Sequence, residues 1–342
     1  MTAGLNHSST TLASSYEFVD DFMARMGPAV DADVVDRGSL SSILGYALDK
    51  PGKLVRPLVM LAANDVAGGD PRQVFHAALA SEYGHIGSLL HDDVIDNDLI
   101  RRGRPSVLAR YGAPGAIVGG DGLIFLLFYA MTRCAEAGVP AGRVVNAIQH
   151  IARAGVEMCR GQALEATATA GPDLTIETYL SVIYGKTAAS FEAACAVGAT
   201  LAGAGPDDVT ELSRFGKHFG LAFQMQDDLL PYRSSGEAAG KSAFSDLENG
   251  RVTLPFLIAV QVASPADHEL LVRTQAVAAA GKQVADIEQV AAVIGRPEVM
   301  SRCAEHERRQ IAQAAGALDR FGGGPGKQFL SDLIEVMAGR VA

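Results

Sequence analysis

The chain has 342 residues, with 29 lysines and arginines against 39 aspartates and glutamates, and a net charge of −10 at pH 7. This length is sufficient for one large domain with a substantial core. The acidic balance argues against a nucleic-acid partner. Because the four cysteines (Cys134, Cys159, Cys195 and Cys303) form no CxxC pair, we expect buried thiols in the cytoplasm and neither a disulfide framework nor a zinc site.

The sequence indicates neither a signal peptide nor an integral membrane segment. No basic segment precedes an apolar one at the N-terminus, as a secretory signal would require. The most apolar run, residues 116–131, is interrupted by Gly119, Gly120, Asp121 and Gly122. We expect this interruption to leave too short an apolar stretch to span a bilayer.

Helical periodicity dominates the chain after a short N-terminal segment. Residues 1–15 are rich in serine and threonine and are expected to be flexible. From Tyr16 onward, alanine- and leucine-rich segments are punctuated by glycine and proline clusters, without a useful alternating strand pattern. We therefore predict an all-α fold in residues 16–342, a single domain of about ten or more helices around a central cavity.

Two basic residues precede the first long apolar segment. Lys53 and Arg56 lie three residues apart in the sequence Gly-Lys-Leu-Val-Arg-Pro. They fit a solvated helix start, or a pair of donors to a phosphate group.

Three carboxylates then lie within five residues. Asp92, Asp93 and Asp96 follow an apolar run, and Arg101 and Arg102 come shortly after. On a helix, Asp92 and Asp96 share a face, where their charges repel unless a cation binds. Oxygen-only ligands favour Mg²⁺, which often completes its shell with substrate phosphates, and arginines bind phosphate oxygens. The pattern therefore predicts a magnesium-bound diphosphate.

The same predicted helix carries small residues on the side of Asp92. Ser81, Gly84 and Ser88 lie below the carboxylates together with His85, and Ser81 is about 16 Å from Asp92 at roughly 1.5 Å per residue. These small side chains can leave a groove for an apolar chain. Alternatively, they simply allow close helix packing.

Further polar residues lie in the second half of the chain. Lys186 and Thr187 interrupt an apolar helix, where a lysine is costly unless it is paired. Gln224 precedes the acidic pair Asp227 and Asp228. Each feature alone is a weak signal, because an adjacent aspartate pair is usually a solvated face or a helix cap.

The ordered set of motifs is specific. GKLVRP, HDDVID, RRGRP, GGDGL, GQALE, YGKTA, FQMQDD, GK and TLP occur between about residues 45 and 260, and this set resembles the trans-isoprenyl diphosphate synthases of the polyprenyl synthetase family, in particular geranylgeranyl diphosphate synthases. The resemblance implies an isoprenoid synthase fold, a homodimer and about three Mg²⁺ ions. It also implies condensation of isopentenyl diphosphate with dimethylallyl, geranyl or farnesyl diphosphate by ionisation, condensation and elimination.

The resemblance assigns roles to residues that match the family motifs. The implied metal-binding residues are Asp92, Asp96 and Asp227, with Asp93 and Asp228 supporting them indirectly. The implied isopentenyl diphosphate site contains Lys53, Arg56, His85 and Arg102. The implied allylic site contains Arg101, Lys186, Thr187, Gln224, Lys241 and Arg251, of which Arg101, Lys186, Thr187 and Gln224 are closest to the chemistry. Arg251 replaces the usual lysine.

The second acidic motif departs from the family pattern. Pro231 occupies the position of a third acid, and a proline there is expected to kink or end the helix. The chain is then either an ordinary chain-elongating synthase with weaker Mg²⁺ binding, or a specialised member: a class I terpene cyclase, an unusual coupling enzyme or a non-catalytic partner subunit. The retained isopentenyl-site residues favour the ordinary synthase.

The residues before Asp92 bear on product length. In the family, bulky aromatics at the positions of Gly87 and Ser88 close the product pocket early. Small residues here imply geranylgeranyl diphosphate (C20) or longer, unless the groove is capped by the helix that begins at Asp121. Candidate caps there are Phe125, Leu126 and Phe128.

The variant Ser88→Phe tests the predicted groove. A phenyl ring at this position should fill the space below Asp92 and shorten the main product, as measured by chain-length analysis of products made from labelled isopentenyl diphosphate. An unchanged product length would mean that the growing chain runs elsewhere.

Overall fold

The computed structural model describes residues 16–35, 37–168, 175–233, 245–282 and 284–339. Nearly all of these residues lie in helices, which confirms the predicted all-α fold. The N-terminal segment predicted to be flexible, residues 1–15, lies outside the described residues.

The described elements follow one another with short connections. The first half contains α2 (Glu17–Val34), α3 (Ser39–Leu48), α4 (Val55–Val66), η1 (Pro71–Val74), α5 (Phe75–Ile95), β1 (Ile100–Arg101), β2 (Arg104–Pro105), α6 (Val107–Glu136) and α7 (Ala141–Ala168). The second half contains α8 (Ile176–Ile183), η2 (Tyr184–Ala188), α9 (Ala189–Ala202), α10 (Pro206–Arg233), α11 (Ser245–Glu248), α12 (Leu254–Val262), α13 (Pro265–Ala279), α14 (Ile287–Ile294), α15 (Pro297–Ala317) and α16 (Pro325–Ala338).

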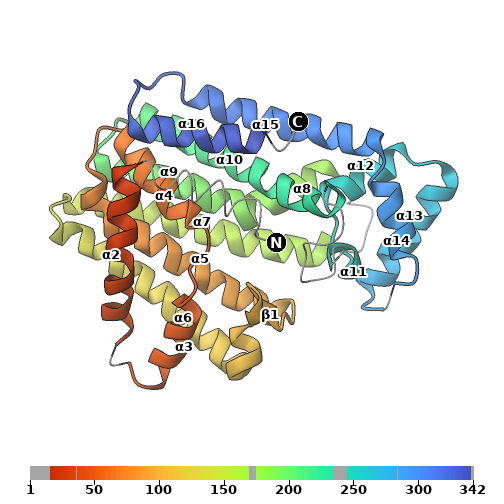
Figure 1. Ribbon diagram of the computed structural model, residues 1–342, viewed down its shortest axis with the longest axis horizontal. Coiled ribbons are helices and arrows are strands. Elements are labelled where there is room, and N and C mark those ends of the chain that lie inside the picture. The colour runs from red at the N-terminus through yellow and green to blue at the C-terminus, as the bar shows by residue number, and fades with distance from the viewer. Residues whose placement is uncertain (1–15, 36, 169–174, 234–244, 283, 340–342) are drawn as a thin grey trace.

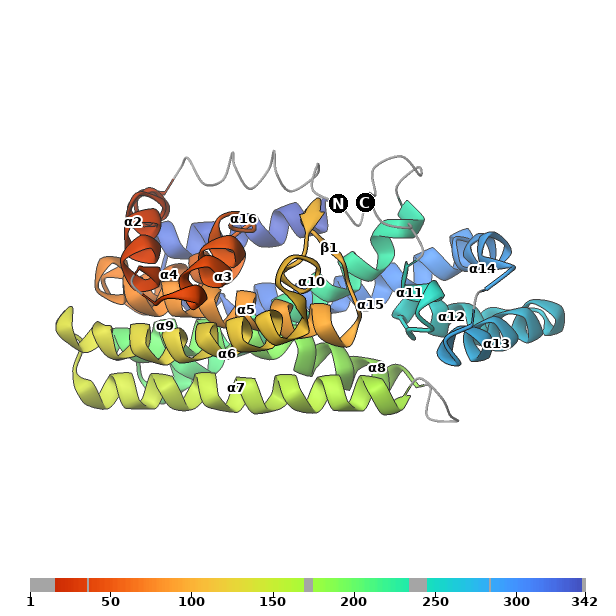
Figure 2. The same cartoon turned by 90° about the horizontal axis from the view of Figure 1, so that it is seen from below.

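The helices form an elongated bundle. In Figure 1, α2 and α3 lie at one end of the long axis and α12 to α14 lie at the other. Figure 2 shows α6 and α7 side by side, with α7 on the outside of the bundle. The strands β1 and β2 form a short antiparallel hairpin directly after α5.

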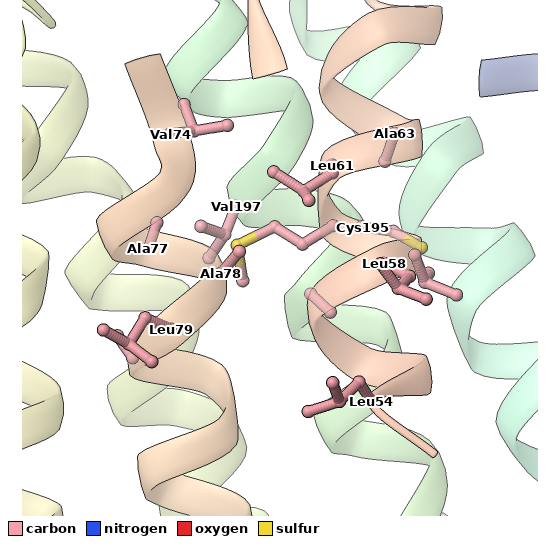
Figure 3. Close-up of a cluster of buried hydrophobic side chains, with 14 of the residues drawn as sticks. Leu54, Leu58, Leu61, Ala63, Val74, Ala77, Ala78, Leu79, Cys195 and Val197 are labelled. Carbon is pink, nitrogen blue, oxygen red and sulfur yellow. The ribbon is translucent and has the colours of Figure 1, made fainter. Parts of the chain in front are cut away.

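The main core lies between α4, α5 and α9 (Figure 3). Leu61 from α4, Leu79 from α5 and Val197 from α9 are almost fully buried. A Cβ atom added to Gly198 would lie 2.3 Å from the carbonyl oxygen of Met60, so α4 and α9 meet at backbone contact. This close packing fixes α4, whose N-terminus carries Arg56.

Helix α10 belongs to two hydrophobic clusters. Phe215 and Phe219 pack in the main core, whereas Met225 and Leu229 pack in a second cluster with α12, α14 and α15. Because the buried face of the helix continues through both clusters, the segment with Asp227 and Asp228 is held on a rigid support.

Helix α6 differs from the sequence prediction. The glycines at 119, 120 and 122 do not break it, and the helix runs over 30 residues. By length and composition it could cross a membrane, with a mean hydropathy of 1.6 over a window that is 44% buried. This is weak evidence, since the core helix of a soluble protein passes the same test. Gly87 and Gly119 instead let α5 and α6 pack closely, because an added Cβ at either position would lie 3.0–3.1 Å from the other helix.

The cysteine prediction is correct in part. All four cysteines are free. Cys134, Cys195 and Cys303 are buried, but Cys159 on the outer helix α7 is exposed, so the prediction of a buried thiol is wrong there.

Candidate active site

The first acidic cluster lies at the C-terminal end of α5. The Asp96 N–H donates to the Asp92 carbonyl oxygen over 2.8 Å, which ends the helix at Asp96. Carboxylates are disfavoured here, because the negative end of the helix dipole is at this terminus. Burial raises the pKa of Asp92, Lys186 opposes this shift, and the charge of Asp96 adds to it. A cation bound at Asp92 and Asp96 would remove this strain.

A two-residue turn presents the two arginines that follow. Arg102 and Gly103 both have positive φ values, 53° and 73°, as in the tight turns that suit short hairpins. The Arg101 Nε donates to Asp93 Oδ1 over 2.8 Å, and the same guanidinium contacts Asp98. Asp93 is 1% exposed. Its visible role is therefore to hold Arg101 against the end of α5.

A π-helical turn, η2, carries Lys186 and Thr187. Such turns occur frequently at functional sites. A Cβ on Gly185 would lie 2.6 Å from the Glu157 carbonyl oxygen, so this glycine brings η2 against α7. The contact allows Lys186 Nζ to form an ion pair with Glu165 of α7.

The second acidic motif differs in its two aspartates. Asp227 is half-buried, whereas Asp228 is 7% exposed and accepts hydrogen bonds of 2.8 Å from Tyr179 and from Gln224. Burial, and then the charge of Asp246, raise the pKa of Asp228 to about 7. Both Asp228 oxygens therefore serve internal contacts. Helix α10 continues through Pro231 to Arg233, so the proline does not end it there.

A separate basic group surrounds a buried acid on α5. Glu82 is 4% exposed, and its Oε1 has no hydrogen-bond partner. Burial raises its pKa, opposed by the charges of Arg102 and Arg56. Burial lowers the pKa of Arg56 to about 10. It also lowers the pKa of His85 well below its usual range, with Arg56 and Arg102 adding to the effect, so His85 is neutral.

Both arginines of this group are held by contacts to other elements. The Arg56 guanidinium lies 4.5 Å from the Phe191 ring centroid, and its Nε donates to Ser190 over 2.8 Å. Arg102 Nη1 donates to the Lys50 carbonyl oxygen over 2.8 Å. Lys53 is half-buried in the loop before α4. The arrangement places several cations near α4 and the hairpin, in a group distinct from Lys186.

Arg251 links the first acidic cluster to a distant segment. Its Nη2 donates to Asp96 Oδ2 over 2.5 Å, and its Nη1 to Asp246 Oδ1 over 3.3 Å. Burial alone would lower the pKa of Arg251, but the charges of Asp96 and Asp246 raise it. One carboxylate predicted to bind metal is thus paired with an arginine.

The described residues contain no group of three or more histidine, cysteine or acidic side chains that could hold a metal ion alone. This is compatible with Mg²⁺, which is commonly held by one or two carboxylates plus substrate phosphates. The pair Asp92 and Asp96 fits that requirement, since the two acids are adjacent on one helix end. Lys241 lies outside the described residues.

The predicted groove residues have different environments. A Cβ on Gly84 would lie 2.6 Å from Leu127 Cδ1, and Gly87 abuts α6, which fits the close-packing alternative for these two positions. Ser81 and Ser88 are half-buried. Among the candidate caps, Leu126 is buried and Phe128 half-buried, whereas Phe125 is 73% exposed.

Sequence reasoning omitted four residues that the structure brings to this region: Glu82, Glu165, Tyr179 and Ser190. The two glutamates had a usable signal, because an acid within an apolar helical segment needs a partner. Tyr179 and Ser190 had none, since a tyrosine or serine at those positions is ordinary in a helix.

Comparisons with known proteins agree with this site. The model of the polyprenyl synthetase family matches residues 37–294. The chain is 34% identical to geranylgeranyl diphosphate synthase of Sulfolobus acidocaldarius, over 68% of this chain and 70% of that protein. It is also 34% identical to heptaprenyl diphosphate synthase component 2 of Geobacillus stearothermophilus, over 94% and 97%.

A solved structure shares the fold along most of the chain. The polyprenyl synthase from Caulobacter crescentus CB15, complexed with calcium and isoprenyl diphosphate, matches with a TM-score of 0.84 and 27% identity, covering 94% of this chain and 96% of that one. The chain therefore belongs to the polyprenyl synthetase family and is a prenyltransferase.

Proposed function

We propose that the enzyme condenses isopentenyl diphosphate head-to-tail with an allylic diphosphate and releases a trans-polyprenyl diphosphate of C20 or longer. The observation that carries this proposal is the presence of two cation groups beside one carboxylate pair. Arg56 and Arg102 form one group with neutral His85, and Lys186 and Arg251 form the other. Two groups suit two diphosphates.

Asp92 and Asp96 would hold Mg²⁺, which supplies positive charge to the leaving diphosphate. A calcium complex of a related synthase supports a divalent ion in this fold. Asp227 is the second motif's candidate ligand, because Asp228 is engaged by Tyr179 and Gln224. The family expectation of about three ions is part of this proposal.

The reaction then follows from positioning and charge. Lys186 and Arg251 stabilise the allylic diphosphate as its C–O bond breaks. The amide oxygen of Gln224 and the carbonyl groups of η2 stabilise the allylic cation. Arg56 and Arg102 orient isopentenyl diphosphate so that its double bond attacks the allylic carbon. A proton is then lost to the departing pyrophosphate, so no histidine or serine nucleophile is needed.

A homodimer is the proposed assembly. Val118, Phe125 and Tyr129 are exposed at 53%, 73% and 54% on α6, and a second copy would cover this apolar stripe. The name of the heptaprenyl synthase component 2 supports an alternative, in which a different subunit is the partner. We also propose a single domain over residues 16–342 in the cytoplasm, supported by the shared helix α10 and the free thiols.

A product assay tests the proposed function. Purified enzyme with Mg²⁺, labelled isopentenyl diphosphate and farnesyl diphosphate should yield products of C20 or longer together with pyrophosphate. The variant Asp92→Asn should lose at least about a hundredfold in rate, since charge stabilisation is removed from the transition state. A product no longer than C15 would contradict the length assignment. Hydrocarbon formed from geranylgeranyl diphosphate alone would instead indicate a cyclase.

The pH profile tests the state of His85. A neutral histidine only donates or accepts a hydrogen bond, so His85→Gln should retain kcat/KM for isopentenyl diphosphate within about threefold between pH 6 and 8, while His85→Ala should lose about tenfold. Because the pKa of His85 is lowered, the wild-type enzyme should show no loss of isopentenyl diphosphate affinity as the pH rises from 6 to 7. Such a loss, absent in His85→Gln, would mean that a protonated histidine binds the substrate.

A further inference from the structure

A continuous series of hydrogen bonds connects the two cation groups. Arg56 Nε on α4 donates to Ser190 Oγ over 2.8 Å, and Ser190 Oγ donates to the Thr187 carbonyl oxygen over 2.8 Å. Thr187 Oγ1 then donates to Gln224 Oε1 over 2.7 Å. The series thus runs from α4 through α9 and η2 to α10.

The series ends at a buried carboxylate. Gln224 Nε2 donates to Asp228 Oδ1 over 2.8 Å, and the Tyr179 hydroxyl on α8 donates to Asp228 Oδ2 over 2.8 Å. Thr187, Asp228 and Tyr179 are only 4% to 8% exposed. Since water has little access, the geometry of these groups is set by one another.

The direction of each bond follows from the chemistry of its partners. An ionised carboxylate only accepts, so the NH₂ group of Gln224 must face Asp228. The amide oxygen then faces Thr187, whose hydroxyl must donate to it. Tyr179 occupies the other oxygen of Asp228 and prevents the carboxylate from rotating away from Gln224. One phenolic hydroxyl therefore fixes the orientation of an amide in the neighbouring layer.

We propose that Tyr179 and Ser190 are positioning residues that align the two substrates. Tyr179 acts through Asp228 to keep the oxygen of Gln224 on the side where the allylic cation forms. Ser190 ties Arg56, in the isopentenyl diphosphate group, to the same turn that carries Lys186 and Thr187. The inference rests on the proposed condensation reaction, and it assigns no direct substrate contact to either residue.

Steady-state kinetics of Tyr179→Phe test the first assignment. Without the hydroxyl, Asp228 and the Gln224 amide can reorient, so kcat should fall about tenfold, the size expected for one charge-assisted hydrogen bond. The KM for either diphosphate should change less than about twofold, because the cations are untouched. Assays at pH 8 keep the carboxylate ionised.

A matched control separates positioning from stability. Tyr83 is also buried, and its hydroxyl donates to buried Asp33 over 2.8 Å, in a network with Arg133. Tyr83→Phe should lower the melting temperature much as Tyr179→Phe does and leave kcat unchanged. An equal change of kcat in the two variants, or no change in Tyr179→Phe, would overturn the role of Tyr179.

Ser190→Ala tests the second assignment. Loss of the Arg56 contact should raise the KM for isopentenyl diphosphate about fivefold with a small change in kcat, and Ser190→Thr, which keeps the hydroxyl, should restore it. Ser213, whose hydroxyl donates to the Val209 carbonyl oxygen within α10, provides the control Ser213→Ala. An unchanged KM in Ser190→Ala, or a fall in kcat alone, would overturn this assignment.

Binding distinguishes this proposal from the proposed function. Calorimetric titration with isopentenyl diphosphate should show the same weakening in Ser190→Ala as the KM does. If the wild-type enzyme makes no prenyl product, the proposed function fails, while the titration still decides whether Ser190 positions Arg56.

Discussion

The structure depends on charge compensation inside an apolar helical bundle. Cations of the predicted diphosphate sites have carboxylate partners, such as Asp93 for Arg101, Glu165 for Lys186 and Asp96 for Arg251. An unpaired charge in such surroundings is costly, and removing one partner of a buried pair leaves that cost uncompensated. The protein therefore stays folded without ligand by pairing the groups that it uses for binding. Substrate diphosphate and Mg²⁺, which carry opposite charges, can replace both partners of a pair together.

The helices that hold these pairs are placed by backbone contacts between small residues. Gly185 brings η2 against α7, and Gly198 brings α9 against α4. These contacts carry no charge and bind no substrate, yet they determine which acid meets Lys186 and which hydroxyl meets Arg56. The same support explains how the chain tolerates Pro231. Helix α10 is fixed by two hydrophobic clusters, and Asp228 is held by Tyr179 and Gln224 independently of a third acid.

Local features were predictable from the sequence, whereas long-range pairings were not. The relation of Asp92 to Asp96 follows from helix geometry, and apolar periodicity indicated the all-α class. The partner of Asp96 is Arg251, 155 residues away, and no periodic pattern encodes that contact. The π-helical turn and the two-residue strands β1 and β2 are too short to leave a pattern. The small residues before Asp92 were compatible with both a groove and close packing, and only the neighbouring helix α6 separates Gly84 and Gly87 from Ser81 and Ser88.

Competition for Asp96 offers the most direct measurement. Binding of Mn²⁺ to the ligand-free protein, followed by electron paramagnetic resonance, should be tighter in Arg251→Gln than in the wild type, because Asp96 is released to join Asp92. The variant Arg296→Gln removes an arginine from a surface pair with Asp267 and should leave Mn²⁺ affinity unchanged. Equal or weaker Mn²⁺ binding by Arg251→Gln would contradict the account, since it would mean that the arginine does not compete with the metal for this carboxylate.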